Sequence, residues 1–228
     1  MQKNVTKIFV MVIIFTLIFL LLFIFFMQAY NTSNNAFRCK TFYFVGINKS
    51  NNLEALETAK SFEKQKGAGV VYSKENVCFV VAFGYTNKEI AQTIASNNNL
   101  QVYELNIPKV NKNVLGQKKY SGVLDFVSNF DEFVLDLYNV CIELEKGEIQ
   151  SQDAVINISK LIMILENYIN GEYNNPFEFE DFLTKTIDNA KNIIDANILN
   201  LNTLIYLKKF YVNFIFDYAF FVNKIDEE

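Results

Sequence analysis

The feature that most constrains this chain is an apolar run near its start, residues 8–27, in which Thr16 is the only polar side chain. At a rise of about 1.5 Å per residue, a helix of this length crosses the ~30 Å hydrocarbon core of a bilayer. A helix that is apolar on every side suits lipid better than the surface of a water-soluble protein. The sequence therefore predicts one N-terminal transmembrane helix, over residues 8–29.

The charges on either side of this run predict its orientation. Lys3 and Lys7 lie just before it, whereas the first positive charges after it are Arg38 and Lys40. Because positive charges favour the cytoplasmic side, we expect residues 1–7 to form a cytoplasmic tail and the C-terminal region to be extracytoplasmic. A cleaved signal peptide is the alternative, although the apolar run exceeds the usual length of about 7–15 residues for that class.

The composition argues against several classes of function. The formal net charge of −4 argues against a nucleic-acid-binding surface. The chain has no His, which removes the commonest metal ligand and the usual general base near neutral pH. Cys39, Cys78 and Cys141 show no CxxC spacing, so we expect neither a metal site nor a cofactor. Free thiols and a Cys39–Cys78 disulfide both remain open at this point.

After a linker at residues 30–40, the hydrophobic pattern changes to one of strands and helices. Aromatic and β-branched runs predict strands, and stripes of Leu and Ala at i, i+3 spacing predict helices. In chain order we expect a strand at 41–47, a helix at 52–66, strands at 70–72 and 77–85, a helix that includes 90–95, and a strand at 100–107. Residues 41–108 are thus predicted to form a βαββαβ domain, with both helices on one face of a four-stranded sheet.

Short motifs in this domain carry a family resemblance. They are YFVG at residues 43–46, NNLEA at 51–55, KGAG at 66–69, FVVAF at 79–83 and KEIA at 88–91. In order and spacing they resemble the SPOR (sporulation-related repeat) domain, in particular its membrane-anchored forms from spore-forming Firmicutes. The resemblance implies a ferredoxin/RNP-like fold that binds the glycan strands of septal peptidoglycan through the sheet face left open by the helices. The glycan-binding residues that it implies are Phe42, Phe44, Gly46, Phe79, Val81, Phe83 and Tyr85.

The implied glycan face departs from the family pattern. Phe44 stands where the family often has Gln, and Ile47 stands where it often has Ser. A sugar site needs hydrogen-bonding groups beside its aromatic rings, and this face is mostly Phe and Val. Two interpretations follow: either the site has diverged, or this face packs against another protein element.

A linker at residues 109–119 leads into a helical region at 120–226, in which apolar residues recur at alternating spacings of three and four. The last of its three apolar seams runs through Asn197 and Lys208, which either set the packing register or accompany a break near residues 200–202. We expect an antiparallel three-helix bundle, with an intermolecular coiled coil as the alternative. In either case the region offers a surface to a protein partner.

The sequence carries no catalytic constellation. Glu178, Glu180 and Asp181 cluster after Pro176, at the start of a predicted helix, where carboxylates complement the helix dipole. There is no nucleophile elbow and no Gly-rich phosphate loop. We therefore predict that the chain is not an enzyme.

Together these features predict an α+β chain made of a transmembrane helix, a SPOR-like domain and an all-α antiparallel bundle. The predicted function is that of a membrane-anchored envelope protein that binds or localises to septal peptidoglycan in cell division or sporulation. The alternative is a structural protein–protein scaffold of a sporulation or envelope complex, without glycan binding. The expected partners are the membrane, peptidoglycan glycan strands and a protein that contacts the helical region, and nucleic acid is not among them.

Overall fold

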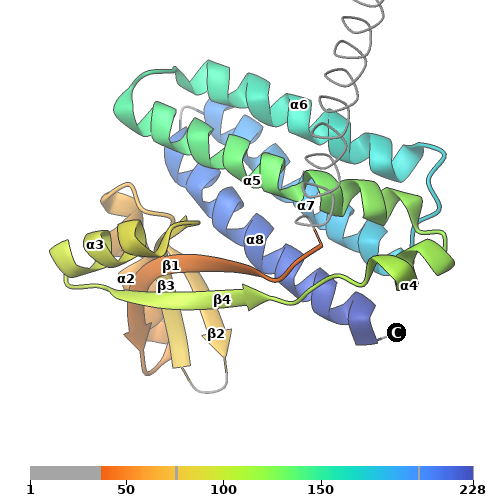
Figure 1. Ribbon diagram of the computed structural model, residues 1–228. Coiled ribbons are helices and arrows are strands. Elements are labelled where there is room, and N and C mark those ends of the chain that lie inside the picture. The colour runs from red at the N-terminus through yellow and green to blue at the C-terminus, as the bar shows by residue number, and fades with distance from the viewer. Residues whose placement is uncertain (1–36, 75–76, 200, 228) are drawn as a thin grey trace, which may run out of the picture.

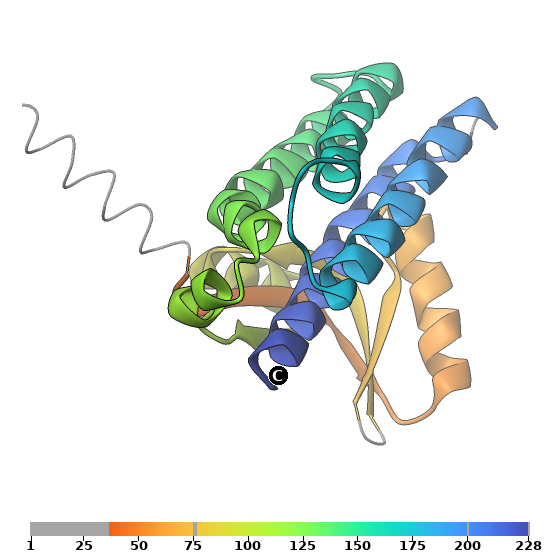
Figure 2. The ribbon, with the colours of Figure 1, turned by 90° about the vertical axis from the view of Figure 1, so that its right-hand side faces the viewer.

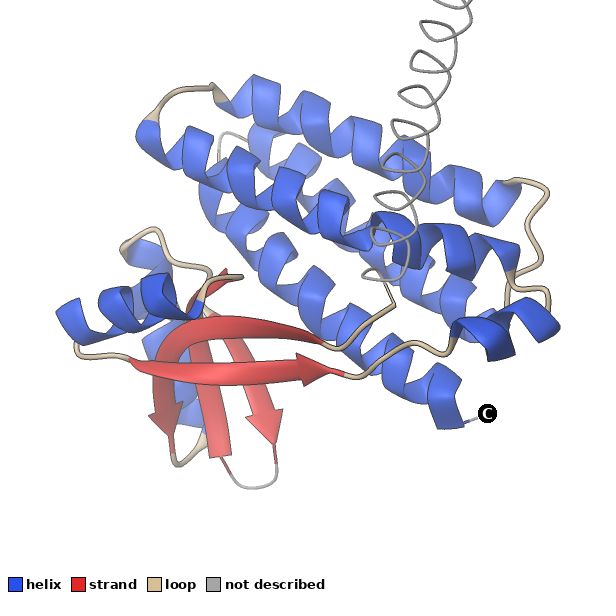
Figure 3. Ribbon diagram, in the orientation of Figure 1, coloured by secondary structure: helices blue, strands red, loops and turns tan. Residues whose placement is uncertain are grey.

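The computed structural model describes residues 37–74, 77–199 and 201–227, which form an α+β structure with a four-stranded antiparallel sheet (Figures 1 and 3). The first half holds the sheet and two helices, and the second half is helical. The elements in chain order are β1 (Lys40–Lys49), α2 (Asn52–Lys64), β2 (Val70–Lys74), β3 (Val77–Tyr85), α3 (Lys88–Asn97), β4 (Gln101–Ile107), α4 (Lys112–Gln117), α5 (Ser121–Lys146), α6 (Ser151–Asn170), α7 (Phe177–Ile198) and α8 (Thr203–Glu227).

The two helices of the first half begin at asparagine caps. The Asn51 side chain accepts a hydrogen bond from the Glu54 backbone N–H at 2.9 Å, and that of Asn87 accepts one from the Ile90 N–H at 3.0 Å. Each bond satisfies a backbone donor that the first helical turn leaves without a partner. The caps thus fix where α2 and α3 start after β1 and β3.

The sheet has the strand order β2-β3-β1-β4, with β1 and β3 in the centre. Alanines let α2 and α3 lie close against one face, because Ala55, Ala59, Ala91 and Ala95 are all at most 5% exposed. The opposite face is aromatic. The helix α8 crosses this second face and contacts β2, β3 and β4 (Figures 1 and 2).

A β-bulge interrupts the pairing of the two central strands. Val45 pairs with Phe83 and the next residue, Gly46, pairs with Val81, so Ala82 has no partner on β1. Since side chains alternate between the two faces of a sheet, one extra residue reverses the alternation beyond it. Phe83 and Tyr85 therefore lie on the face opposite to that of Phe79 and Val81.

The helices α5, α6, α7 and α8 pack on one another, and α8 and α5 also contact the sheet. Along this group α6 packs on α7, α7 on α8, and α8 on α5. One continuous cluster of buried side chains runs from Phe44 on β1 to Ile225 on α8, while a smaller cluster lies beneath α2. The sheet and the helices of the described residues therefore share one hydrophobic core.

The predicted fold was wrong in its helical part, although the α+β class and the four-stranded sheet are present. The helical region is not a separate three-helix bundle, because a break after Ile198 divides the expected long third helix into α7 and α8. Asn residues near this point disfavour a continuous helix, and α8 folds back antiparallel to α7. Within the described residues, no helix is both long enough and apolar enough to cross a bilayer. The predicted transmembrane segment, residues 8–29, lies outside the part of the chain that the structure describes.

Candidate functional site

All seven residues of the implied glycan site are buried, which leaves none of them accessible to a sugar in this structure. Gly46 is buried like the others. The exposed fractions of the six side chains are 3% for Phe42, 0% for Phe44, 4% for Phe79, 0% for Val81, 5% for Phe83 and 9% for Tyr85. A sugar-binding aromatic residue must present its ring to solvent before the ligand arrives.

Phe216 of α8 is the residue that most directly covers the open sheet face. Its ring stacks on Phe44 of β1 at a centroid distance of 4.5 Å and an interplanar angle of 17°. It also stacks on Tyr72 of β2 at 4.5 Å and 13°. Nearby, Phe42 meets Phe130 of α5 edge to face at 6.4 Å. Aromatic rings of the protein's own helices therefore occupy the place where a sugar ring would stack.

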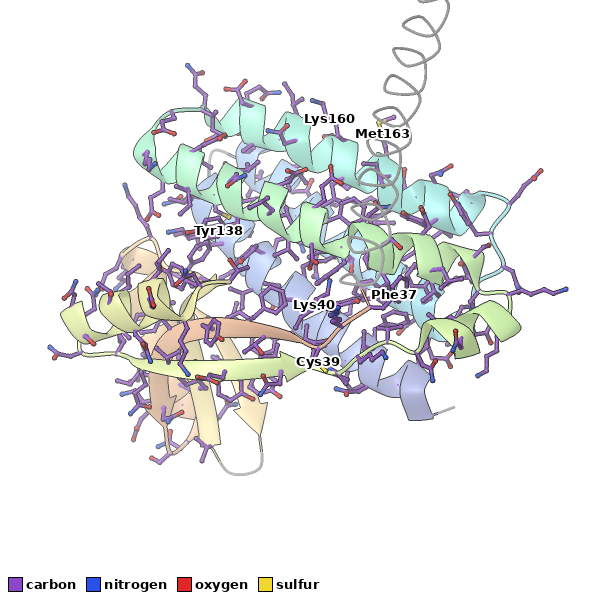
Figure 4. The ribbon with its side chains drawn as sticks, viewed as in Figure 1. Phe37, Cys39, Lys40, Tyr138, Lys160 and Met163 are labelled. Carbon is purple, nitrogen blue, oxygen red and sulfur yellow. The ribbon has the colours of Figure 1, made fainter. Side chains whose placement is uncertain are left out.

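The β-bulge separates Phe83 and Tyr85 from the other five residues. Phe83 stacks on Tyr138 of α5 at 5.8 Å and lies 5.1 Å from Tyr211 of α8, while Tyr85 meets Tyr138 at 6.4 Å. In Figure 4, Tyr138 extends from α5 on the side of the sheet. An uninterrupted alternation would place the seven residues on one face, whereas the structure distributes them over both faces.

Gly46 has a steric role in the sheet. A Cβ atom at this position would lie 2.0 Å from the Val80 carbonyl oxygen, which is too close for any side chain. The backbones of β1 and β3 approach closely next to the bulge, and only glycine fits there. This packing requirement accounts for Gly46 without a ligand.

A buried lysine of α8, Lys208, joins the helices to the sheet half of the chain. Its Nζ donates to Glu145 Oε1 of α5 at 2.7 Å and to the Lys66 carbonyl oxygen, just after α2, at 3.0 Å. The same atom lies 5.1 Å from the centre of the Phe83 ring, within cation–π range. A cavity of about 490 Å³ lies beside this residue, where α2, α3, β3, α5 and α8 meet. The sequence showed Lys208 only as an interruption of an apolar seam, with no sign of its partners.

A second lysine, Lys40, attaches the start of β1 to α5. Its Nζ donates to Asp131 Oδ1 at 2.6 Å and lies 5.2 Å from the centre of the Phe130 ring. Burial lowers the pKa of Lys40, and the hydrogen bond to Asp131 opposes that change. Figure 4 shows Lys40 near Phe37 and Cys39, where β1 begins below α5. Both lysines thus connect elements that are far apart in the sequence.

The cysteines do not form a reactive centre. Cys39 is exposed, Cys78 and Cys141 are buried, and all three are free thiols, so the structure has no Cys39–Cys78 disulfide. Burial raises the pKa of Cys141, which keeps it protonated at neutral pH and therefore poorly nucleophilic. Within the described residues, no group of three or more Cys, Asp or Glu side chains could hold a metal ion.

Comparisons with known proteins identify no relative of this chain: no protein-family model, no curated protein and no solved structure matches it. The resemblance to the SPOR family therefore stays a prediction from sequence motifs. In the structure, α8 covers the aromatic face of the sheet, and α2 and α3 cover the opposite face. Within the described residues, the outer surface of the helices is open to a partner.

Proposed function

We propose that this chain is a non-catalytic scaffold of a cell-envelope complex, in which the SPOR-like sheet is a packing element and does not bind glycan. The observation that carries the proposal is the stack of Phe216 on Phe44 and Tyr72, which leaves Phe44 with no exposed surface. The SPOR-like sheet then serves as the internal support for the helices. Other proteins bind the exposed surface of the helices.

The free-energy cost of uncovering the aromatic sheet face argues against glycan binding there. Exposing a buried Phe side chain costs about 1.5–3 kcal/mol. To reach this face, a glycan strand must displace Phe216 and expose both Phe42 and Phe44, so its binding energy must first offset several kcal/mol. The face offers aromatic and aliphatic side chains but few hydrogen-bonding groups to offset that cost.

Sedimentation with purified peptidoglycan sacculi tests the proposal. We expect the full-length chain to stay in the supernatant with untreated sacculi and with sacculi stripped of stem peptides by an amidase. A Phe216→Asp variant, designed to loosen α8 from the sheet, serves as the matched comparison. Sedimentation of the unmodified chain, increased by amidase treatment, would show glycan binding and overturn the scaffold proposal.

We propose the cell membrane as the location, with the C-terminal region outside the cytoplasm. Support for this comes from the sequence alone, in the charge asymmetry around residues 8–27. A C-terminal tag on the chain should be digested by protease added to intact protoplasts. Digestion only after lysis would place the described residues in the cytoplasm and contradict an envelope role.

A further inference from the structure

A groove with a volume of about 640 Å³ lies between α5 and α6. Its residues recur along both helices at spacings of three and four, so the groove follows the helix axes. On α5 it extends from Asn129 to Glu143, which corresponds to about 21 Å or four turns at ~1.5 Å per residue. These dimensions match one amphipathic helix of about four turns.

The floor of the groove is apolar and recessed. Leu137, Val140, Ile158 and Leu161 line it and are 1–7% exposed. At its edge, Ile164 of α6 is 44% exposed, so water reaches much of this large aliphatic side chain. Helix-in-groove recognition uses this type of apolar floor, which receives side chains at i, i+3, i+4 and i+7 of the bound helix.

The charge along the groove has one dominant sign. Three carboxylates, those of Glu132, Asp136 and Glu143, lie along the α5 side, and Lys160 is the one basic residue among the lining residues. Lys160 lies on the outer side of α6 (Figure 4). None of the three carboxylates has an ion-pair partner within the described residues.

The other carboxylates of α5 have partners within the chain. Asp131 pairs with Lys40, Glu145 pairs with Lys208, and Asp125 accepts a hydrogen bond from the Tyr168 hydroxyl at 2.7 Å. Acidic residues of α5 that face other parts of the chain are therefore matched, and those that face the groove are not. This contrast on a single helix points to complementary charge supplied from outside.

We infer that the α5–α6 groove binds an amphipathic helix of a partner protein, with leucine-type residues on one side and Lys or Arg along its flank. The inference rests on the proposed scaffold function and names the surface and the chemistry of its partner. A lipid surface suits the groove poorly, because the apolar floor is recessed and an acidic edge is repelled by anionic headgroups.

A designed peptide pair tests this inference on the full-length chain. The basic peptide is a 21-residue helix with Leu at i, i+3, i+4 and i+7 and Lys on both flanks, and the acidic peptide has Glu in place of each Lys. Fluorescence anisotropy should show that the basic peptide binds at least about tenfold more tightly, and that its affinity falls as salt rises.

Two charge-reversal variants of the chain locate the contact. The groove variant is Glu132→Lys, Asp136→Lys and Glu143→Lys, and we expect it to weaken the basic peptide about tenfold or more, since three favourable charge pairs are lost. A control with the same change in net charge reverses three exposed carboxylates outside the groove, Glu57→Lys, Glu172→Lys and Asp195→Lys. The control should bind within about twofold of the unmodified chain.

A variant at the groove edge tests the apolar contact separately. Ile164→Ser changes a half-exposed position, so the fold should tolerate it while the basic peptide loses affinity severalfold. Met163→Ser, at a 69% exposed position beside it that does not line the groove, should leave the affinity unchanged.

Several results would overturn the inference. They are equal binding of the two peptides, no binding of either one, or an equal loss of affinity in the control variant. Concentration-dependent self-association that the groove variant abolishes would assign the groove to a second copy of this chain. Failure of the peptide experiment leaves the scaffold function standing, whereas that function itself fails if the unmodified chain sediments with sacculi.

Discussion

Replacing Phe216 by Ala tests whether α8 and the sheet share one core. In the structure the Phe216 ring stacks on Phe44 and Tyr72, each at 4.5 Å, so it is the main aromatic link between α8 and the open sheet face. Phe220, one helical turn further along α8, is 63% exposed and provides the matched control. The two substitutions remove the same atoms from the same helix.

The structure sets the expected size of the effect. A fully buried Phe→Ala substitution costs about 3–5 kcal/mol, and Phe216 is mostly but not fully buried, so the lower part of that range applies. Each lost aromatic pair adds about 0.5–1.5 kcal/mol. We therefore expect Phe216→Ala to lower the free energy of unfolding by about 3 kcal/mol or more. Phe220→Ala should lower it by less than ~1 kcal/mol, since the side chain is mostly in water.

Urea unfolding of the full-length chain measures both values. Circular dichroism follows the helices, and tyrosine fluorescence provides a second signal. In a double-mutant cycle, Phe44→Leu combined with Phe216→Leu should show a coupling energy of about 0.5–1.5 kcal/mol. If Phe216→Ala were no more destabilising than Phe220→Ala, or the cycle showed no coupling, the covered sheet face and the function argued from it would be refuted.

Three further predictions concern buried polar groups. The Tyr211 hydroxyl is buried without a hydrogen-bond partner in the described residues, so Tyr211→Phe should keep or raise the free energy of unfolding, by up to ~1 kcal/mol in a urea titration. Glu145→Gln leaves the buried Lys208 cation without its counter-charge and should cost about 2 kcal/mol in the same titration, because Glu145 is partly exposed. Burial raises the pKa of Tyr211 and Tyr218, so above pH ~10 the unfolded chain loses these protons before the folded chain does. The free energy of unfolding should therefore fall as pH rises above that value, and Tyr218→Phe should make the fall less steep, as measured by unfolding at several pH values.

Much of the sheet half could be predicted from the sequence because its signals are local. Aromatic and β-branched runs lie at the strands, and Asn51 and Asn87 lie at the helix starts that they cap. Alanines recur at i, i+4 spacing in α2 and α3, and all four are buried. Such features depend on residues within one turn or one strand of each other, which a single sequence displays directly.

The position of the bulge, and the choice between a continuous helix and the break near residues 200–202 that the sequence left open, depend on longer-range packing. The uninterrupted run VCFVVAFGY in β3 reads as one regular strand, yet Ala82 is left unpaired when β1 and β3 align. In the second half, the spacing of three and four continues past Ile198, although the chain turns there to bring α8 against α7. Periodicity indicates where helices and strands lie, but it does not show which element covers each apolar face.

The burial of the implied glycan site also depends on long-range packing. Two observations were present in the sequence: a sheet face of Phe and Val without polar groups, and a C-terminal helix rich in aromatic residues. Whether these two surfaces meet depends on the path of the chain, which carries α8 back across the sheet. Because α8 packs on the sheet face, the candidate residues have the composition of a binding face and are nevertheless buried.

Covalent linkage gives α8 an advantage over any other occupant of the sheet face. A helix on the same chain is present at a high effective concentration and loses little translational entropy when it binds the sheet. An external glycan or protein must therefore compete with α8 for this face. The Lys208–Glu145 ion pair attaches α8 to α5, and the Lys40–Asp131 ion pair attaches α5 to the start of β1. A partner is therefore better accommodated where the chain leaves apolar surface and carboxylates unmatched, and within the described residues the α5–α6 groove combines both features.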